Sequence, residues 1–270
     1  MKKFTCMNIS VILLIVSFFT FYTQCEPSVD AAAHTKYTIN RETIENELTR
    51  LNTLNLSCEN RAIAEEKLNF MLLTEAERTS LVQASVQTSV SRSFFDFKSC
   101  DVPHFRQERD DYCGPATAKQ TIHYLTDGVI SPTQNALAGY IGWTDEYGSS
   151  TAKIQEWLEE QGFMYYRVDV NTLTMRDVVN YVATDLDAYD NPCFGAVAVT
   201  EEEKIDGVWP YDTEGHILNI SGIYQYEPDY TRSELVFTDP FITWADTTNT
   251  TGKHIVSLRN YFSVKTSFWW

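Results

Sequence analysis

The feature that most constrains the fold is the order of the hydrophobic patterns between residues 101 and 270. Short runs of helical period come first, and runs with the character of strands come later. The regular alternation of strand and helix that would predict a parallel sheet does not occur. The sequence therefore predicts an α+β domain, in which helices pack on an antiparallel sheet.

The expected elements of this domain follow from the same patterns. Helices are expected at 114–126, 133–141, 151–161 and 174–187. Strands are expected at 164–170, 194–200, 216–224, 234–238 and 253–258. The sequence has no internal repeat, so we expect residues 99–270 to form one domain.

The N-terminus has the pattern of an export signal. Lys2 and Lys3 precede an apolar run from Ile9 to Phe21. As a helix this run would span only ~20 Å, which is short of a bilayer core. We predict a signal peptide at residues 1–25 and a secreted or cell-surface protein. An uncleaved signal anchor and lipidation of Cys25 stay open as alternatives, and no other stretch is suited to cross a membrane.

Residues 26–98 are expected to form a linker followed by a helical region. Residues 26–39 lack periodicity, whereas a helical pattern begins at Arg41 and a second helical run follows at 62–73. Such a segment could be a spacer or a packing extension of the main domain. We place the boundary to the main domain near residues 95–100.

Composition and charge exclude several classes of protein. The chain has 37 acidic against 21 Lys and Arg residues and a net charge of −16, which repels phosphate backbones. Nucleic-acid binding is therefore not expected. There is no metal-ligand spacing such as CxxC or HExxH and no phosphate-binding glycine loop, so we expect no metal and no other cofactor. The sequence leaves the oligomeric state open.

Four cysteines remain after a signal peptide is removed. Export would permit disulfides, and the favoured pair is Cys58 with Cys100, because both lie outside the motifs described below. Cys193 falls in an apolar run typical of a buried strand. Cys113 is the candidate for a free, reactive thiol.

Cys113 comes directly before one of the expected helices. Gly114 and Pro115 follow it, and an apolar-periodic run continues to Leu125. The unpaired N–H groups and the dipole at a helix N-terminus favour the thiolate, which is the nucleophilic form of cysteine. The amides of Cys113 and of Gln107 could stabilise an oxyanion by about 3 kcal/mol each.

A thiolate nucleophile needs a histidine as its acid and base. His123 shares the helix of Cys113 but lies about 15 Å along its axis, which is too far for a hydrogen bond. His34 falls in the linker. His104 and His254 remain candidates, but neither has a carboxylate placed to orient it in an adjoining strand, whereas His216 does.

His216 and Asp239 belong to two runs that predict an antiparallel hairpin. A register that pairs residues whose numbers sum to 455 gives a consistent apolar face. The expected pairs are His216 with Asp239, Leu218 with Phe237, and Ile220 with Leu235. Asp239 would then fix the tautomer of His216 and favour the imidazolium ion.

These motifs resemble those of the C39-like cysteine peptidases, which are domains of the papain superfamily. The shared pattern is Gln107, then Cys113-Gly114, then Gly215-His216, then Asp239 before a proline. The resemblance as a whole covers about 165 residues. The resemblance implies a papain-like fold, with Cys113 as nucleophile, His216 as general acid and base, Asp239 as orienting acid and Gln107 as oxyanion donor. It implies a peptide or protein substrate, cleaved at a peptide or isopeptide amide. Because papain-like peptidases often carry an inhibitory pro-segment, the helical region 41–90 could be one, as an alternative to a spacer or a packing extension.

The chain departs from this family in one respect. The C39 domains that remove double-glycine leader peptides are fused to a transporter, and neither its membrane helices nor its ATPase occurs in this sequence. Leader-peptide processing is therefore not expected. Acyl transfer to an amine stays open as an alternative to hydrolysis, and so does a catalytically silent domain that binds peptides or a surface partner.

Overall fold

The computed structural model describes residues 41–88, 95–226 and 229–270 of the chain. Residues 39–270 form one compact unit. The predicted signal peptide and linker lie outside the described residues. Within the described ranges, no helix combines the length and the apolar character needed to span a membrane.

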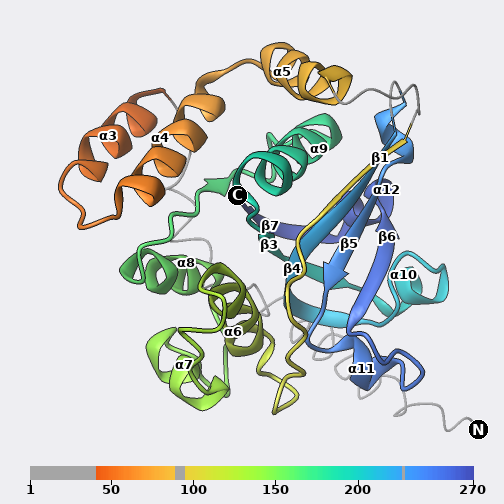
Figure 1. Ribbon diagram of the computed structural model, residues 1–270. Coiled ribbons are helices and arrows are strands. Elements are labelled where there is room, and N and C mark those ends of the chain that lie inside the picture. The colour runs from red at the N-terminus through yellow and green to blue at the C-terminus, as the bar shows by residue number, and fades with distance from the viewer. Residues whose placement is uncertain (1–40, 89–94, 227–228) are drawn as a thin grey trace, which may run out of the picture. The chain divides into compact units, whose positions relative to one another are not determined.

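Within the described residues, three helices precede the sheet (Figure 1). They are α3 (Arg41–Leu51), α4 (Cys58–Leu72) and α5 (Glu75–Thr88). The helical N-terminal region is thus confirmed, although α4 begins before the expected residue 62 and α5 was not expected. The start of α5 is explained by a capping box, in which Thr74 and Glu77 each bond the backbone N–H of the other.

The core of the domain is a seven-stranded antiparallel sheet (Figure 1). Six of its strands follow the order β2-β7-β3-β4-β5-β6, and β1 pairs with the C-terminal part of β4. The strands are β1 (Phe95–Ser99), β2 (Arg167–Val168), β3 (Cys193–Val199), β4 (Thr213–Tyr226), β5 (Glu234–Thr238), β6 (Lys253–Ser257) and β7 (Lys265–Trp269). The antiparallel α+β class is confirmed. The strand expected at 164–170 is reduced to β2, and β1 and β7 were not expected.

The helices after β1 follow the sequence pattern closely. Four were expected, and each lies within a few residues of its predicted range: α6 (Cys113–Leu125), α7 (Gln134–Tyr140), α8 (Thr151–Glu160) and α9 (Met175–Thr184). A π-helical turn at Asp185–Tyr189 prolongs α9. Three short helices were not expected, namely α10 (Glu201–Ile205), α11 (Ile242–Ala245) and α12 (Leu258–Val264).

Helix α6 is fastened to strand β4 by buried polar contacts. The Thr117 hydroxyl donates to the carbonyl of Ile217 over 2.8 Å, and the Thr121 hydroxyl donates to the side chain of Asn219 over 2.8 Å. Asn219 in turn donates to Gln120 over 3.0 Å. Because these groups have no access to water, the helix cannot slide along the strand without leaving them unpaired. They therefore fix the helix that begins at Cys113 relative to the strand that carries His216.

The N-terminal helices share their packing with the sheet domain. Phe70 of α4 lies in one hydrophobic cluster with Trp270, and their ring centroids are 5.3 Å apart. Lys67 of the same helix is completely buried, with Nζ 2.8 Å from Oδ1 of the buried Asp185. Arg78 of α5 pairs with Asp177 of α9. Helices α4 and α5 thus supply part of the core.

The expected disulfide between Cys58 and Cys100 is wrong. All four described cysteines are free, and Cys58 lies exposed at the start of α4. Cys100 is instead buried beside the sheet, with Sγ 3.7 Å from the carbonyl oxygen of Ser221. Cys58 lies on the N-terminal helices and Cys100 lies beside the sheet. The fact that both residues fall outside the motifs does not show that they are close in space.

Candidate active site

Cys113 occupies the first position of α6. The preceding residue, Tyr112, makes no capping bond with its side chain, and the first turn is otherwise buried. The backbone N–H groups of that turn have no acceptor within the helix. The sulfur therefore sits partly exposed at the positive end of the helix.

His216 and Asp239 meet on the sheet, although the predicted register is wrong. The paired residues are Asn219 with Thr238 and Ile220 with Phe237, and a bulge then shifts the remaining pairs by one. This register differs by two residues from the expected one, so the same faces are kept. His216 and Asp239 become diagonal rather than direct neighbours, which is within reach of two such side chains.

The side chains of His216 and Asp239 form a buried hydrogen bond. His216 Nε2 lies 2.8 Å from Asp239 Oδ1, and both side chains are shielded from solvent. His216 also makes a side-chain hydrogen bond with Cys113. The structure thus brings sulfur, imidazole and carboxylate into one chain of contacts.

The contacts within this chain shift the pKa of each group. Burial by itself would raise the pKa of the Cys113 thiol, but the hydrogen bond and charge of His216, with backbone N–H groups, lower it below the ordinary thiol value. Burial would lower the pKa of His216, but the charge and hydrogen bond of Asp239 raise it to about 10. Burial opposes ionisation of Asp239, yet the charge of His216 and the hydrogen bonds of two histidines hold its pKa well below the usual range. These directions favour a thiolate–imidazolium pair beside an ionised carboxylate.

Gln107 lies next to this chain of contacts, but its side chain points its donors elsewhere. Its backbone N–H donates to the carbonyl of Pro240 over 3.1 Å, directly after Asp239. Its side-chain amide donates to the carbonyls of Arg109 and Asp110, over 2.9 and 2.6 Å. Both amide hydrogens are therefore used by the loop that leads to α6.

Two further residues contact Asp239: Tyr211, which the sequence did not indicate, and His254, which the sequence left open only as an alternative acid and base. The hydroxyl of Tyr211 lies 2.6 Å from Oδ2, and Nε2 of His254 lies 2.9 Å from the same oxygen. His254 stands beside Phe237 in the register of β6, so it is diagonal to Asp239 from the opposite side to His216. Predicting the contact of His254 with Asp239 from the sequence would have required the register of a third strand, β6.

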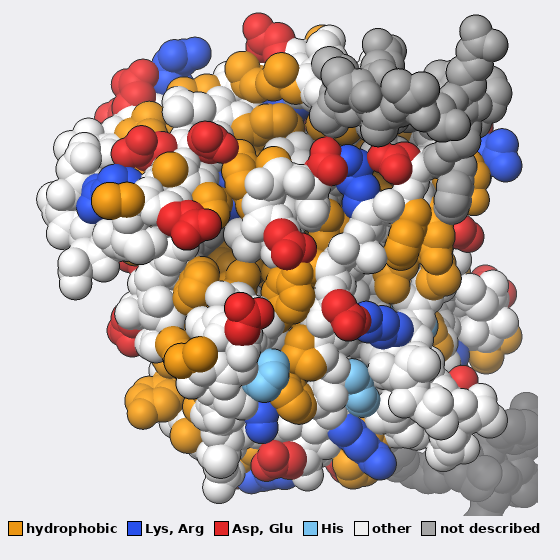
Figure 2. Space-filling model, viewed as in Figure 1, with side chains coloured by type: hydrophobic (Ala, Val, Ile, Leu, Met, Phe, Trp, Pro, Cys, Tyr) orange, Lys and Arg blue, Asp and Glu red, His pale blue; other side chains and the backbone are white. Residues whose placement is uncertain are grey.

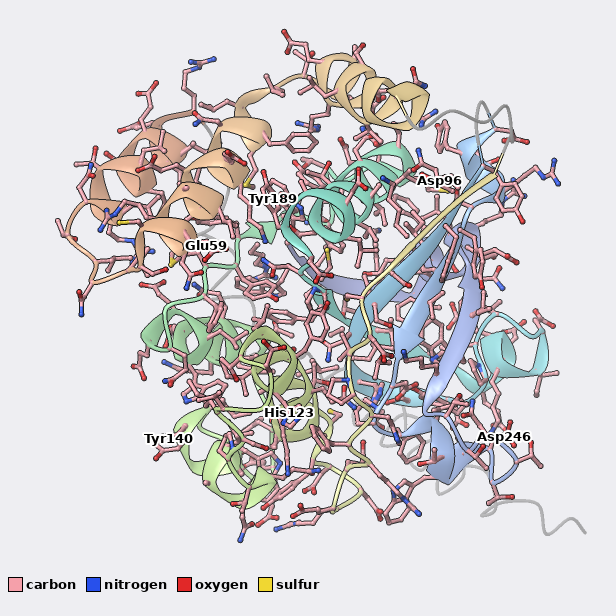
Figure 3. All side chains as sticks on the ribbon, viewed as in Figure 1. Glu59, Asp96, His123, Tyr140, Tyr189 and Asp246 are labelled. Carbon is pink, nitrogen blue, oxygen red and sulfur yellow. The ribbon has the colours of Figure 1, made fainter. Side chains whose placement is uncertain are left out.

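The other described histidines lie apart from the carboxylate oxygens of Asp239. His123, labelled in Figure 3, is near the C-terminal end of α6 and has Nδ1 3.2 Å from the hydroxyl of Ser131. His104 bonds the backbone carbonyl of Asp239, and burial lowers its pKa. His34 lies outside the described residues.

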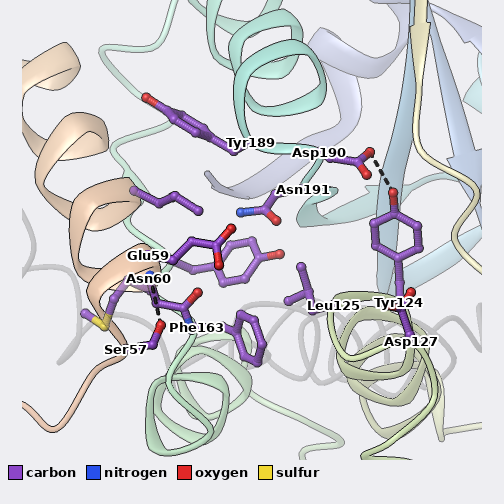
Figure 4. A pocket seen from close by; sticks show the side chains of 13 residues that line it. Ser57, Glu59, Asn60, Tyr124, Leu125, Asp127, Phe163, Tyr189, Asp190 and Asn191 are labelled. Carbon is purple, nitrogen blue, oxygen red and sulfur yellow. Dashed lines mark hydrogen bonds between the residues drawn. The ribbon is translucent and has the colours of Figure 1, made fainter.

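A pocket of about 530 Å³ lies elsewhere on the same unit (Figure 4). It is formed by α4, the residues before β2 and the segment after the π-helical turn, and none of the candidate site residues lines it. Glu59, Asp127 and Asp190 make its wall acidic, and the Tyr124 hydroxyl donates to Asp190 over 2.6 Å. This pocket is therefore separate from the chemistry of Cys113.

The face viewed in Figure 2 carries acidic side chains distributed among apolar and uncharged ones. This distribution accords with the net charge of −16. In the described part of the chain, no cluster of three or more His, Cys, Asp or Glu residues is arranged to hold a metal ion.

The fold and site thus define an α+β domain with a cysteine at a helix N-terminus facing a histidine on the sheet. Comparison with protein families gives the same class, because the model of the Peptidase_C39 like family matches residues 99–266. The chain belongs to this family, whose domains are of cysteine-peptidase type. A comparison with curated proteins finds no match.

Solved structures are also similar to the chain, and two of them are described by their relation to transporters. One is the peptidase domain of Streptococcus ComA, described as a bi-functional ABC transporter involved in a quorum sensing pathway. It is 15% identical with a TM-score of 0.40, and the alignment covers 63% of this chain and 96% of that one. The other is a double glycine motif protease from an AMS/PCAT transporter in complex with the leader peptide, 13% identical with a TM-score of 0.38, covering 64% of this chain and 91% of that one.

Proposed function

We propose that this protein is an exported cysteine peptidase that hydrolyses peptide or isopeptide amide bonds through a thioester on Cys113. The observation that supports it most is the contact chain from Cys113 through His216 to Asp239. A thiolate at a helix N-terminus, with an imidazolium beside it and a buried carboxylate behind, is the arrangement that acyl transfer requires.

The proposed reaction begins with attack of the Cys113 thiolate on the substrate carbonyl carbon. The resulting oxyanion accepts hydrogen bonds from the backbone N–H of Cys113 and from the amide of Gln107, which must first leave its loop carbonyls. His216 gives its proton to the leaving amine as the C–N bond breaks and the thioester forms. His216 then takes a proton from water, which attacks the thioester and releases the acid and the thiolate.

The substrate in this proposal is a peptide or protein. It is cleaved outside the cell or at the cell surface, because residues 1–25 have the pattern of an export signal. The N-terminal sequence of the protein recovered from the culture medium or the cell surface tests this part separately. Recovery of the full chain in the cell interior would contradict it.

The experiment that tests the activity combines peptide cleavage with intact-mass measurement. The purified protein is incubated with a peptide mixture from a digested proteome, and rapid acid quenching is used to trap an acyl adduct on Cys113. We expect cleavage and an adduct for the wild type, and neither for Cys113→Ala. The matched control is Cys58→Ala, which removes an exposed free cysteine far from the motifs in sequence and should leave both unchanged.

The same experiment separates the alternatives. Addition of a primary amine would divert the acyl group into an amide if transfer competes with hydrolysis. A silent binding domain would bind peptides equally well with and without the Cys113 thiol and would form no adduct. Either a missing adduct or cleavage that survives in Cys113→Ala contradicts the proposal.

A further inference from the structure

The carboxylate of Asp239 is surrounded by more donors than a single histidine needs. Oδ1 accepts from His216 Nε2 and from the backbone N–H of Phe241, each over 2.8 Å. Oδ2 accepts from the Tyr211 hydroxyl over 2.6 Å and faces His254 Nε2 at 2.9 Å. Both oxygens of a fully buried carboxylate are thus satisfied.

The tautomer of His254 is fixed by its surroundings. Its Nε2 faces a carboxylate oxygen, which can only accept, so Nε2 carries a proton. Its Nδ1 is buried and has no hydrogen-bond partner among the described residues. The ring stacks against Phe237, with centroids 5.4 Å apart, and meets the edge of Trp209 at 5.2 Å. His254 therefore presents its Nε2 proton to Asp239 from a rigid aromatic setting.

Tyr211 is held as a donor in the same way. Burial and the charge of Asp239 raise its pKa well above the ordinary phenol value, so it stays protonated throughout the working range. Its ring meets that of His216 at 5.5 Å and that of Phe241 at 5.0 Å, both edge to face. Tyr211 thus contacts the carboxylate and the imidazole that the carboxylate orients.

The torsion that turns an aspartate carboxylate is soft, since terminal torsions of this kind are broad and roughly two-fold. The bonds to Oδ1 alone would leave the plane of the Asp239 carboxylate weakly defined. Two further donors on Oδ2, one from the segment before β4 and one from β6, fix that plane. They also offset the cost of keeping the buried charge, which burial would otherwise remove by raising the pKa of Asp239.

We propose that Tyr211 and His254 are positioning residues that hold Asp239 ionised and aimed at His216, and thereby maintain the thiolate of Cys113. The proposal rests on the function proposed above, in which Cys113, His216 and Asp239 act together. The titratable groups that face Asp239 are Tyr211, His216 and His254, and His104 bonds its backbone carbonyl. Tyr211 and His254 act through the carboxylate and need not touch a substrate.

The test measures the rate of Cys113 alkylation by iodoacetamide across a pH series, followed by peptide mapping. This rate reports the thiolate whether or not a substrate is cleaved. In Tyr211→Phe we expect a loss of roughly tenfold at mildly acidic pH, the usual size for one hydrogen bond to a charged group. At alkaline pH the rate should match the wild type, because the thiol is then ionised in both proteins.

Matched variants separate positioning from packing. Tyr261→Phe removes the hydroxyl of another buried tyrosine, which has no partner among the described residues and packs on Phe237, and it should leave the pH profile unchanged. His254→Leu should resemble Tyr211→Phe, whereas His254→Gln retains a donor near the Nε2 position and should restore most of the rate. In an Asp239→Asn background, Tyr211→Phe should change the rate by less than about twofold, because its target charge is already absent.

Three results would overturn this inference. One is a pH profile of Cys113 alkylation in Tyr211→Phe that equals the wild-type profile. Another is a loss of alkylation rate on Tyr211→Phe substitution that is equally large in the wild type and in the Asp239→Asn background. The third result is measured on the wild-type protein and so does not depend on the folding of a variant. Proton NMR should show slowly exchanging imidazole N–H signals from both His216 and His254. Absence of the His254 signal would contradict its hydrogen bond to Asp239. If instead wild-type Cys113 itself reacts like an ordinary thiol, it is the proposed function that fails.

Discussion

Substitution of Lys67 by methionine should destabilise the protein strongly. Lys67 Nζ lies 2.8 Å from Asp185 Oδ1 and 3.1 Å from Oδ2, and both side chains are completely buried. Tyr165 and Trp270 place their rings about the ammonium group, at 5.0 and 5.3 Å from their centroids. Removing one partner of such a pair leaves an uncompensated buried charge and costs about 3–5 kcal/mol. For a chain of this size that is a fall of roughly 6–20 °C in melting temperature.

The cost of Lys67→Met should also depend on pH. Burial raises the pKa of Asp185, and Lys67 opposes that rise. Without Lys67, the pKa of Asp185 in the folded state moves further above its value in the unfolded state. The folded state therefore binds the Asp185 proton more tightly than the unfolded state does. Stability of the variant then falls as pH rises from the unfolded pKa of about 3.9 towards the folded one. The difference in free energy of unfolding between the wild type and Lys67→Met should therefore be larger at about pH 8 than at about pH 5.

Urea denaturation at the two pH values measures this effect. The double variant Lys67→Met with Asp185→Asn removes both charges. Its difference from the wild type in free energy of unfolding should no longer become larger as the pH rises. Lys153→Met, which breaks an exposed pair with Glu156 on α8, is the surface control and should cost less than about 1 kcal/mol. A loss for Lys67→Met below about 1 kcal/mol, or one that is equal at both pH values, would refute the reasoning from a buried charge.

The remaining predictions concern the site and the N-terminal helices. The pH profile of kcat/KM should be bell-shaped: it rises as Cys113 ionises, below the usual thiol pKa, and falls as His216 loses its proton at about 10. Asp239→Asn should lower kcat by roughly 10²- to 10⁴-fold and move the alkaline limb to lower pH, and an unmoved limb would speak against the pair. Gly114→Ala should cost about 1–3 kcal/mol in thermal unfolding, because its Cβ collides with Ser149, and unchanged stability would contradict that contact. Deletion of α3 to α5 should give insoluble or unfolded protein by circular dichroism, whereas a folded product would mean that these helices are a removable pro-segment.

Much of the domain could be predicted from the sequence because its local signals agree with the fold. Strand β5 lies at the predicted residues, and α6 begins at Cys113 as the Gly-Pro turn indicates. The class of fold follows from the order of these patterns. The short helices α10 and α11 were not predicted because their five and four residues are too few to show a helical period.

The register of the hairpin could not be obtained from parity and loop symmetry. A bulge between Ile220 and Gly222 inserts an extra residue opposite β5, and sequence alternation does not locate it. The direct pairing of His216 with Asp239 was therefore wrong, but their side chains still meet, because a shift by two residues keeps both on the same face.

The contacts of Tyr211 and His254 with Asp239 are purely tertiary. They depend on how β6 pairs with β5 and on how the segment before β4 folds over the sheet. The same holds for the side chain of Gln107, whose donors are taken by loop carbonyls that no spacing identifies. Local pattern therefore gives the residue types of the candidate site, whereas their shared contacts require the assembled sheet.

The most direct measurement of the central claim is a titration of the Cys113 thiolate by its ultraviolet absorbance. The signal is the difference between the wild type and Cys113→Ala as the pH is lowered from neutrality. We predict that the thiolate persists below the ordinary thiol pKa of about 8.5, and that this persistence is lost in His216→Ala. Protonation of Cys113 at the ordinary value, or a titration that is unchanged in His216→Ala, would contradict the account.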